Sequence, residues 1–200
     1  MPLVFDEIVT GFRFAYGGAQ EYYGVVPDLA AYGKVVAGGF PLACIAGPKA
    51  IMRHFDAALE GTPEYVWQAG TFNGNAIACA AGLATLAELR KPDAYPRLFR
   101  TGTRLRDGLA AAVRKHDLAA RVTGEPPVFD IYFTDREIVD YRATLTADRE
   151  RIKRFNQELV RRRVVKAVNK IYVSLAHTDA DVEETLEIFD QALAAIAAQA

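Results

Sequence analysis

The amino-acid sequence predicts an α/β arrangement with a mostly parallel sheet over residues 1–90, followed by an α+β arrangement over residues 91–200. Short apolar strand patterns separated by glycines and prolines fill the first stretch, whereas longer amphipathic helix patterns fill the second. The composition changes at Lys91-Pro92-Asp93, which we take as the boundary between two domains.

Three strands and two helices are expected in the first stretch. Residues 3–5 are typical of a short buried parallel strand, and residues 28–32 and 42–46 of two more. Pro48 is expected to begin a helix through about residue 55, because proline is tolerated in the first helical turn. Residues 75–89 predict an alanine-rich helix whose small side chains permit close approach to a core element or a second subunit.

The second stretch predicts helices that alternate with two strands. Residues 95–114 and 147–162 are expected to be helical, and residues 128–133 and 171–175 to be strands. The capping pattern Thr178-Asp179-Ala180-Asp181 marks the start of a last helix, whose apolar residues recur every three or four positions.

Composition indicates a globular protein without a nucleic acid or an anionic membrane as its main partner. The formal net charge is only −1, so no strong field attracts either polyanion. No apolar stretch reaches the roughly 18 residues of a membrane span, and no signal peptide opens the chain. Cys44 and Cys79 lie among small apolar residues without metal-ligand spacing. We therefore expect buried, reduced thiols and a cytoplasmic location.

An acid and a lysine follow two of the predicted strands. Asp6 ends an apolar run, and Lys34 lies 28 positions later among glycines and small apolar residues. The carboxyl ends of parallel strands are where α/β proteins gather ligand groups, and this separation permits a crossover between neighbouring strands. Pyridoxal phosphate (PLP) needs an anion at its pyridine nitrogen and an amine for its aldehyde. The pair therefore suits a PLP site, although each residue alone is more often structural.

Two further residues extend this candidate site. In an extended chain Ile8 points to the same side as Asp6, where its branched side chain can press on one face of the ring. Thr71 precedes the alanine-rich helix, and a hydroxyl beside helix N–H groups is suited to a phosphate. A simple N-cap by Asn73 or Asn75 is the alternative reading of that segment. The three histidines show no metal or nucleophile spacing, so no metal site is expected.

The wording of several segments resembles the class III aminotransferases, a branch of the fold-type I PLP enzymes. The matching stretches are FDEIVTGFR at 5–13, GGAQEYYGVVPDLAAYGK at 17–34, AGGFPLACIAG at 37–47, QAGTFNGNAIACAAGLATL at 68–86 and YVSLAHTDADVEETLE at 172–187. The resemblance covers nearly all of the chain. It implies that residues 1–90 are the C-terminal part of a PLP-binding large domain and that residues 91–200 are a small domain.

Carried onto this sequence residue by residue, the resemblance implies a role for each candidate. Lys34 is the lysine that binds PLP and carries a proton, Asp6 pairs with the pyridine nitrogen, and Ile8 packs on the ring. Thr71 reaches the cofactor phosphate of the neighbouring subunit, so that a homodimer takes part in the mechanism. The implied partners are a small-molecule amino donor and a keto or aldehyde acceptor.

The sequence departs from the family pattern at three positions outside the core chemistry. Asn73 and Ala76 stand where serine and proline are more usual. Arg163 replaces a glycine that often precedes the strand after this helix, so the turn there is expected to be distorted.

The resemblance leaves three functions open. The first is transamination between two substrates, and the second is the intramolecular transfer of glutamate-1-semialdehyde 2,1-aminomutase, the group with the closest wording. The family's phosphate-binding loop and ring-stacking aromatic residue lie upstream of the aspartate motif, so the chain is expected to be the C-terminal half of an enzyme about twice as long. The third function is therefore none: a non-catalytic remnant that keeps the site residues.

Overall fold

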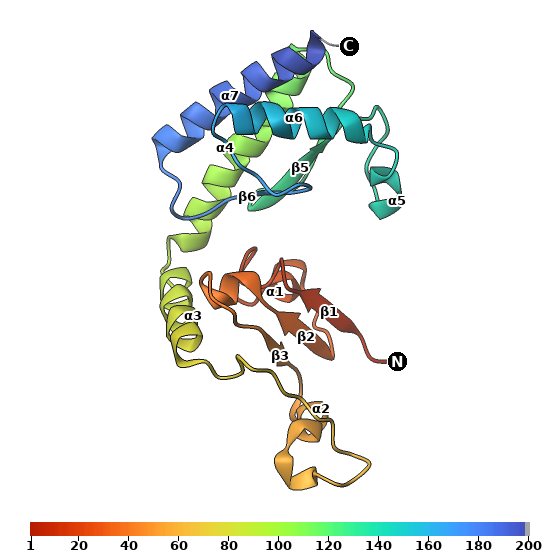
Figure 1. The fold of residues 1–200 in the computed structure, drawn as a ribbon, viewed down its shortest axis with the longest axis vertical. Helices are drawn as coiled ribbons and strands as arrows, with labels where there is room; N and C mark the ends of the chain where they lie inside the picture. The colour runs from red at the N-terminus through yellow and green to blue at the C-terminus, as the bar shows by residue number, and fades with distance from the viewer. Residues whose placement is uncertain (199–200) are drawn as a thin grey trace. The chain divides into compact units, whose positions relative to one another are not determined.

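The computed structural model describes residues 1–198, which divide into two compact units between Tyr95 and Pro96 (Figure 1). We call Met1–Tyr95 unit 1 and Pro96–Ala200 unit 2. Within the described residues each unit contains a three-stranded sheet, ordered β1-β2-β3 in unit 1 and β4-β5-β6 in unit 2.

Unit 1 combines a small sheet with short helices and one long helix, α3. Strands β1 and β2 are parallel and pair Val4 with Leu29 through Glu7 with Tyr32, whereas β2 and β3 are antiparallel. The elements are β1 (Val4–Glu7), α1 (Ala19–Tyr23), β2 (Leu29–Tyr32), η1 (Lys34–Ala37), β3 (Cys44–Ala46), α2 (Lys49–Met52), η2 (Arg53–Phe55), η3 (Ala57–Leu59) and α3 (Ala76–Leu89).

Two expectations for this sheet are corrected. The first strand is not buried, because β1 lies at the edge of the described sheet and Val4 is 60% exposed. The sheet is not mostly parallel either, since it contains one parallel and one antiparallel pair. Residues 33–43 link β2 to β3, and a parallel connection needs a crossover of a dozen or more residues.

The cysteines are also more accessible than expected. Cys44 is exposed, like the other two residues of β3, and Cys79 on α3 is half-buried. Both are unpaired thiols. Desolvation by neighbouring groups raises the pKa of the Cys44 thiol, although the residue as a whole is exposed.

Helix α3 packs against η1, the segment that begins with Lys34. A Cβ atom at Gly82 would lie 2.8 Å from the carbonyl oxygen of Val36, so only glycine permits this approach. Ala78 of α3 is fully buried, and Val36 belongs to the core of unit 1 with Ala30 and Tyr32. The small residues of α3 therefore fix the position of the segment that follows β2.

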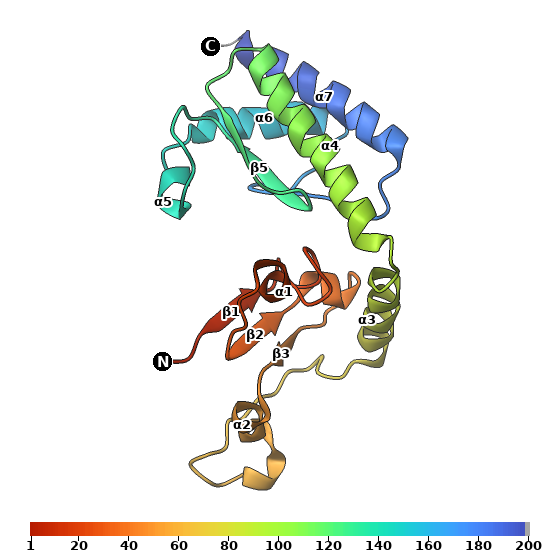
Figure 2. The ribbon, with the colours of Figure 1, turned by 180° about the vertical axis from the view of Figure 1, so that it is seen from behind.

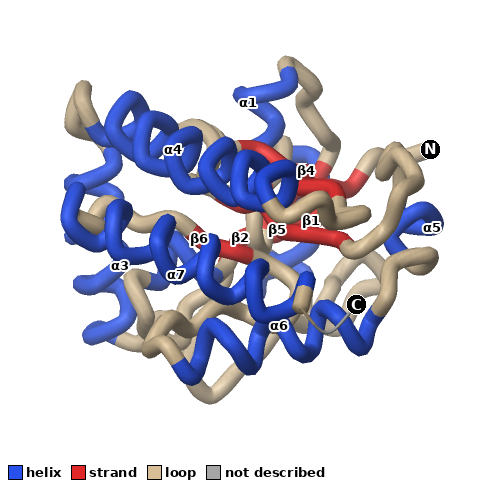
Figure 3. The backbone as a smooth tube through the Cα atoms, turned by 90° about the horizontal axis from the view of Figure 1, so that it is seen from above, coloured by secondary structure: helices blue, strands red, loops and turns tan. Residues whose placement is uncertain are grey.

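Unit 2 has three long helices and an antiparallel sheet (helices blue and strands red in Figure 3). Strand β5 lies in the centre, with β4 on one side and β6 on the other. The elements are α4 (Ala94–Lys115, whose first two residues belong to unit 1), β4 (Arg121–Glu125), β5 (Val128–Tyr132), α5 (Tyr141–Thr144), α6 (Arg149–Arg161), β6 (Ile171–Tyr172) and α7 (Asp179–Ala197).

The core of unit 2 is built from the buried faces of α4, α6, α7 and β5. Phe155 of α6 contacts Phe189 of α7 with ring centroids 6.3 Å apart, and both side chains are almost fully buried. Helices α4 and α7 run side by side in the same direction (Figure 2), since Arg104 pairs with Asp179 and Lys115 pairs with Asp190.

The start of the last helix is confirmed as a capping box. The Thr178 hydroxyl accepts a hydrogen bond from the Asp181 N–H at 3.2 Å, and the Asp181 carboxylate accepts one from the Thr178 N–H at 2.7 Å. Two donors of the first turn are satisfied in this way, so the helix begins where the sequence pattern places it.

The turn at Arg163 closes normally, which corrects the expected distortion. Arg163 has a φ of 68°, the left-handed conformation that glycine usually supplies after a helix. The N–H of Val164 donates to the carbonyl oxygen of Leu159, and the N–H of Arg163 to that of Val160, both at 3.0 Å. These are the two hydrogen bonds of a Schellman motif, formed with arginine at the strained position.

Candidate active site

Lys34 lies two residues after the end of β2, at the first position of η1. Its backbone has a φ of 46°, in the left-handed region that non-glycine residues seldom adopt, and such strain concentrates at functional sites. The side chain is exposed. Within residues 1–198 the Lys34 amine makes no hydrogen bond and no ion pair, so it is available to a ligand.

Asp6 is brought to the same end of the sheet as Lys34. In the parallel pair of β1 and β2, which lie side by side in Figure 1, Asp6 is opposite Ala31, three residues before Lys34. The Asp6 side chain is exposed, and its Oδ1 accepts a hydrogen bond from the N–H of Ile8 at 3.0 Å. The other carboxylate oxygen makes no hydrogen bond in the described chain, so it can accept one from a ligand.

Ile8 reaches this region by a different route from the expected one. Strand β1 ends at Glu7 and Ile8 lies in a turn, so the alternation of an extended chain does not place its side chain. Instead Ile8 packs beside Gly33, where an added Cβ atom would lie 3.1 Å from Ile8 Cδ1. Ile8 and the residue before Lys34 are therefore in contact.

Thr71 lies on a different segment of unit 1, the turn before α3. It is exposed, lies in the turn over residues 71–74, and has no hydrogen bond to Asp6 or Lys34. The N-terminus of α3 is capped by Asn75, whose Oδ1 accepts from the N–H of Ala78 at 3.0 Å. The alternative interpretation of this segment, an N-cap, is therefore confirmed at Asn75. A phosphate contact by Thr71 stays a prediction.

A cofactor of the expected chemistry fits the residues that are present. A carboxylate with a free oxygen and an unpaired amine lie at one end of two adjacent strands, and the contact of Ile8 with Gly33 adds an apolar side chain near them. These are the three groups that a pyridine nitrogen, an aldehyde and an aromatic face require. Among the described residues no group of three or more potential metal ligands occurs.

Sequence reasoning missed Glu7, the neighbour of Asp6. Its side chain is fully buried and accepts hydrogen bonds from the N–H groups of Ala19 and Gln20, both at 2.9 Å, and from the Thr10 hydroxyl. The alternation of side chains in a strand could have indicated the burial of Glu7, because adjacent residues point to opposite faces of the sheet. Asp6 faces outwards and Glu7 inwards.

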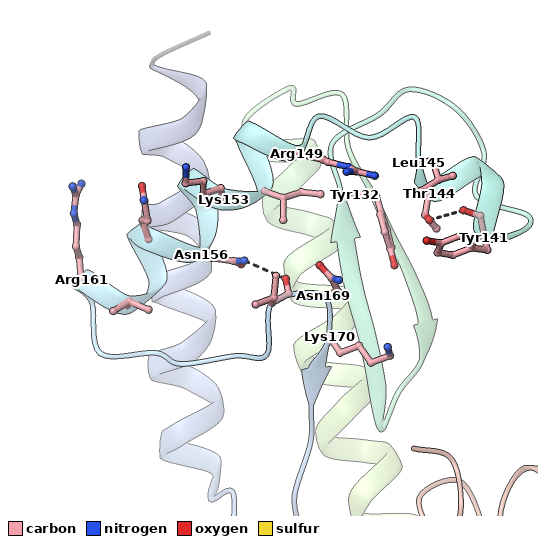
Figure 4. A pocket seen from close by; sticks show the side chains of 14 residues that line it. Tyr132, Tyr141, Thr144, Leu145, Arg149, Lys153, Asn156, Arg161, Asn169 and Lys170 are labelled. Atoms are coloured by element: carbon pink, nitrogen blue, oxygen red, sulfur yellow. Dashed lines mark hydrogen bonds between the residues drawn. The ribbon is translucent and has the colours of Figure 1, made fainter. Parts of the chain in front are cut away.

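A cavity in the described chain lies elsewhere, in unit 2 between α6, α5 and the strands (Figure 4). Its volume is about 1020 Å³, and none of the predicted site residues lines it. Its walls carry two tyrosines and four cationic side chains, Tyr132, Tyr141, Arg149, Lys153, Arg161 and Lys170. Across residues 1–198 no helix is both long and apolar enough to span a membrane.

Known proteins resemble this chain along nearly its whole length. The model of the family described as aminotransferase class-III matches residues 1–193. The glutamate-1-semialdehyde 2,1-aminomutase 2 of Brevibacillus brevis is 40% identical over 194 residues, which cover 96% of this chain and 44% of that protein. The chain thus spans less than half the length of this curated relative.

Solved structures show the same relationship. An omega-transaminase from Sphaerobacter thermophilus matches with a TM-score of 0.88 and 32% identity, over 96% of this chain and 44% of that one. The FumI protein of Sphingopyxis sp. MTA144, solved with PLP, matches with a TM-score of 0.80 and 29% identity, over 98% and 43% of the two chains. The α/β class expected from the sequence is confirmed by these matches, which cover less than half of each solved chain. The chain belongs to the class-III aminotransferase family.

Proposed function

We propose that this chain supplies the lysine and the acid of a PLP site in an enzyme that moves an amino group from an amino donor to a keto or aldehyde acceptor. The observation that carries the proposal is the placement of Asp6 and Lys34. Both stand at the carboxyl end of the parallel pair β1 and β2, with an unpaired amine and a free carboxylate oxygen. This is the edge where α/β proteins bind ligands.

Each residue has a chemical task in this proposal. PLP, when bound, supplies an electron sink that stabilises charge on the substrate carbon next to the amine. Lys34 Nζ would hold the cofactor through its aldehyde group and would take up and return a proton as the general base. Asp6 keeps a proton on the pyridine nitrogen through a charge-assisted hydrogen bond. Ile8 packs on one face of the ring.

The exposure of Lys34 supports a role for a second copy. A lysine acts as a base at neutral pH when burial disfavours its charged form, yet the Lys34 side chain is exposed in this chain. The cofactor and a neighbouring subunit would supply that burial. We propose a homodimer in which the Thr71 hydroxyl of one copy binds the cofactor phosphate of the other, consistent with the exposure of Thr71 and with the lack of a hydrogen bond between Thr71 and Lys34 in the described chain.

The wider organisation follows from the same family. We assign residues 1–90 to the C-terminal part of a PLP-binding large domain and residues 91–200 to a small domain. The unpaired thiols of Cys44 and Cys79 fit a reducing compartment, and we place the protein in the cytoplasm.

An aminomutase is the second candidate, favoured by the name of the relative that is 40% identical. Such an enzyme moves the amino group within one substrate, whereas a transaminase needs a donor and an acceptor. Incubation of the natural gene product with glutamate-1-semialdehyde alone separates the two. A mutase converts it without a second substrate, and a transaminase stops after one equivalent per site. No turnover of either kind would support a non-catalytic remnant.

Replacing Lys34 tests the proposal directly. We expect the natural gene product to gain a visible absorption band with PLP, and Lys34→Ala to abolish that band because it removes the amine that would bind the cofactor aldehyde. Lys49→Ala is the matched control, since Lys49 on α2 is another exposed lysine of unit 1 and should leave the band unchanged. A Lys34→Ala variant that keeps the wild-type band would remove Lys34 from this role.

A further inference from the structure

Glu7 is a buried carboxylate that the proposed chemistry does not use. Its side chain has no solvent exposure, although it adjoins the exposed Asp6. Oε1 accepts from the N–H of Gln20, and Oε2 accepts from the N–H of Ala19 and the hydroxyl of Thr10. Because a buried carboxylate without partners is very costly, three donors on two segments indicate a built polar site.

The backbone around Glu7 is shaped to receive its carboxylate. Gly18, immediately before α1, has a φ of 80°, and a Cβ atom there would lie 2.8 Å from Glu7 Oε2 and 2.9 Å from Oε1. Any other residue would be strained by the conformation and would collide with the acid. The loop and the carboxylate therefore fit each other closely.

Glu7 also joins the two strands that carry the proposed site. Its backbone pairs with Tyr32, two residues before Lys34, and its Thr10 contact closes the turn that contains Ile8. Burial raises the pKa of the Tyr32 hydroxyl, and the Glu7 charge raises it further, so the two side chains share one enclosed environment. The end of β1 is thus held from within.

We propose that Glu7 is a positioning residue that acts through Asp6. The buried Glu7 carboxylate fixes the end of β1 to the start of α1 and to Thr10. The preceding residue, Asp6, then presents its carboxylate outwards, towards the position of the pyridine nitrogen. The Asp6 Oδ1 contact with the Ile8 N–H, at 3.0 Å, then sets the orientation of that carboxylate. This inference rests on the proposed PLP function.

A purely structural role would give a different pattern of effects. If Glu7 only stabilised the fold, its loss would weaken PLP binding by the same factor whatever residue stood at position 6. If Glu7 acts through Asp6, its loss matters only while the aspartate is present. A double-mutant cycle separates the two cases, because it measures the coupling of neighbouring residues and cancels their independent effects.

The experiment measures PLP affinity of the natural gene product by titration of the visible band, in wild type, Glu7→Gln, Asp6→Asn and the double variant. We expect Glu7→Gln to weaken PLP binding about tenfold, a loss of about 1.4 kcal/mol of binding free energy. In the Asp6→Asn background the same substitution should change affinity less than twofold. An equal loss in both backgrounds overturns the positioning role and leaves Glu7 a structural residue.

A matched control and a cofactor-free readout complete the test. Glu21→Gln makes the same chemical change in α1 at an exposed carboxylate that accepts from the Gly17 N–H, and it should leave PLP affinity unchanged. Hydrogen exchange at the Ile8 amide, measured without PLP, should accelerate in Glu7→Gln and not in Glu21→Gln. If the wild-type protein binds no PLP, the proposed function fails. If hydrogen exchange at the Ile8 amide is unchanged in Glu7→Gln, the positioning of Asp6 by Glu7 is overturned separately.

Discussion

Unit 1 and unit 2 differ in how they are held together. The largest fully buried apolar side chains all belong to unit 2. In unit 1 the largest fully buried side chain is that of Glu7, a carboxylate. Large apolar side chains stay exposed along unit 1, including Trp67 at 75%, Leu83 at 70% and Ile77 at 65%. Unit 2 therefore has a self-sufficient core, and unit 1 relies more on backbone pairing and polar contacts.

The proposed PLP site lies in unit 1, the unit that buries fewer large apolar side chains. Asp6 and Lys34 both belong to unit 1, where strand register and close glycine contacts fix their backbones. Helix α3 is apolar on nearly all sides and shows Leu83 and Ile77 to solvent, a pattern typical of a helix that is covered on more than one face. The site stands in the unit with the most apolar surface left to cover.

The largest expected effect comes from removing a core ring of unit 2. Phe155→Ala should lower the free energy of unfolding of unit 2 by about 3–5 kcal/mol, because the ring is fully buried. Phe12→Ala in unit 1, where the ring is only partly buried, should cost less. Hydrogen exchange in α6 and α7, compared with β1 and β2, checks both. Faster exchange throughout unit 1 in Phe155→Ala would show that the two units are not independent.

Acid should weaken unit 2 by a smaller amount. Hydrogen bonding from Arg162 lowers the pKa of Glu158, and hydrogen bonding from Lys115 lowers that of Asp190. Their stabilising contribution is therefore full above their ordinary values of 4.5 and 3.8 and is lost as the pH falls through the lower folded values.

One buried acid of unit 2 has the opposite sign. Burial raises the pKa of Asp130, although Lys166 beside it, at 2.9 Å, opposes the shift. Its contribution is full below the ordinary value of 3.8 and falls as the pH rises through the folded value. Exchange in α6 and α7 at about pH 6 and about pH 3 decides which sign prevails. We expect faster opening in acid, and slower opening would mean that Asp130 dominates.

The smallest effect should be a gain. Arg163→Gly should stabilise unit 2 by ~0.5–1 kcal/mol, because glycine adopts the left-handed conformation at no steric cost. The gain is kept small by the larger conformational entropy that glycine loses on folding. Thermal unfolding measures this change. Arg161→Gly inside α6 is the contrasting control and should destabilise, since glycine lowers helix propensity there. A loss of stability in Arg163→Gly would mean that the arginine side chain makes contacts worth more than the strain.

The sequence predicted the elements with strong periodicity or capping. The helices at Ala76–Leu89, Ala94–Lys115, Arg149–Arg161 and Asp179–Ala197 begin and end within a few residues of the expected bounds. Strand β4 was missed because Gly124 interrupts its pattern, and α1 because five residues carry too little periodicity. The direction of β3 depends on how the chain returns to the sheet, which no local pattern encodes.

The site was predictable as residue types more than as geometry. The acid and the lysine were chosen from their positions after apolar runs, and strand pairing places both at one end of β1 and β2. The left-handed backbone of Lys34 and the contact between Ile8 and Gly33 arise from packing between segments distant in sequence. For the same reason Glu7 was overlooked, since its partners lie 12 and 13 residues away.

The contact between Glu7 and the backbone at Gly18 also limits how this sequence can change over generations. A side chain at position 18 would collide with the buried acid, and loss of the acid would leave three donors without a partner. A lineage can therefore alter this pair only through a less stable intermediate or by two changes together.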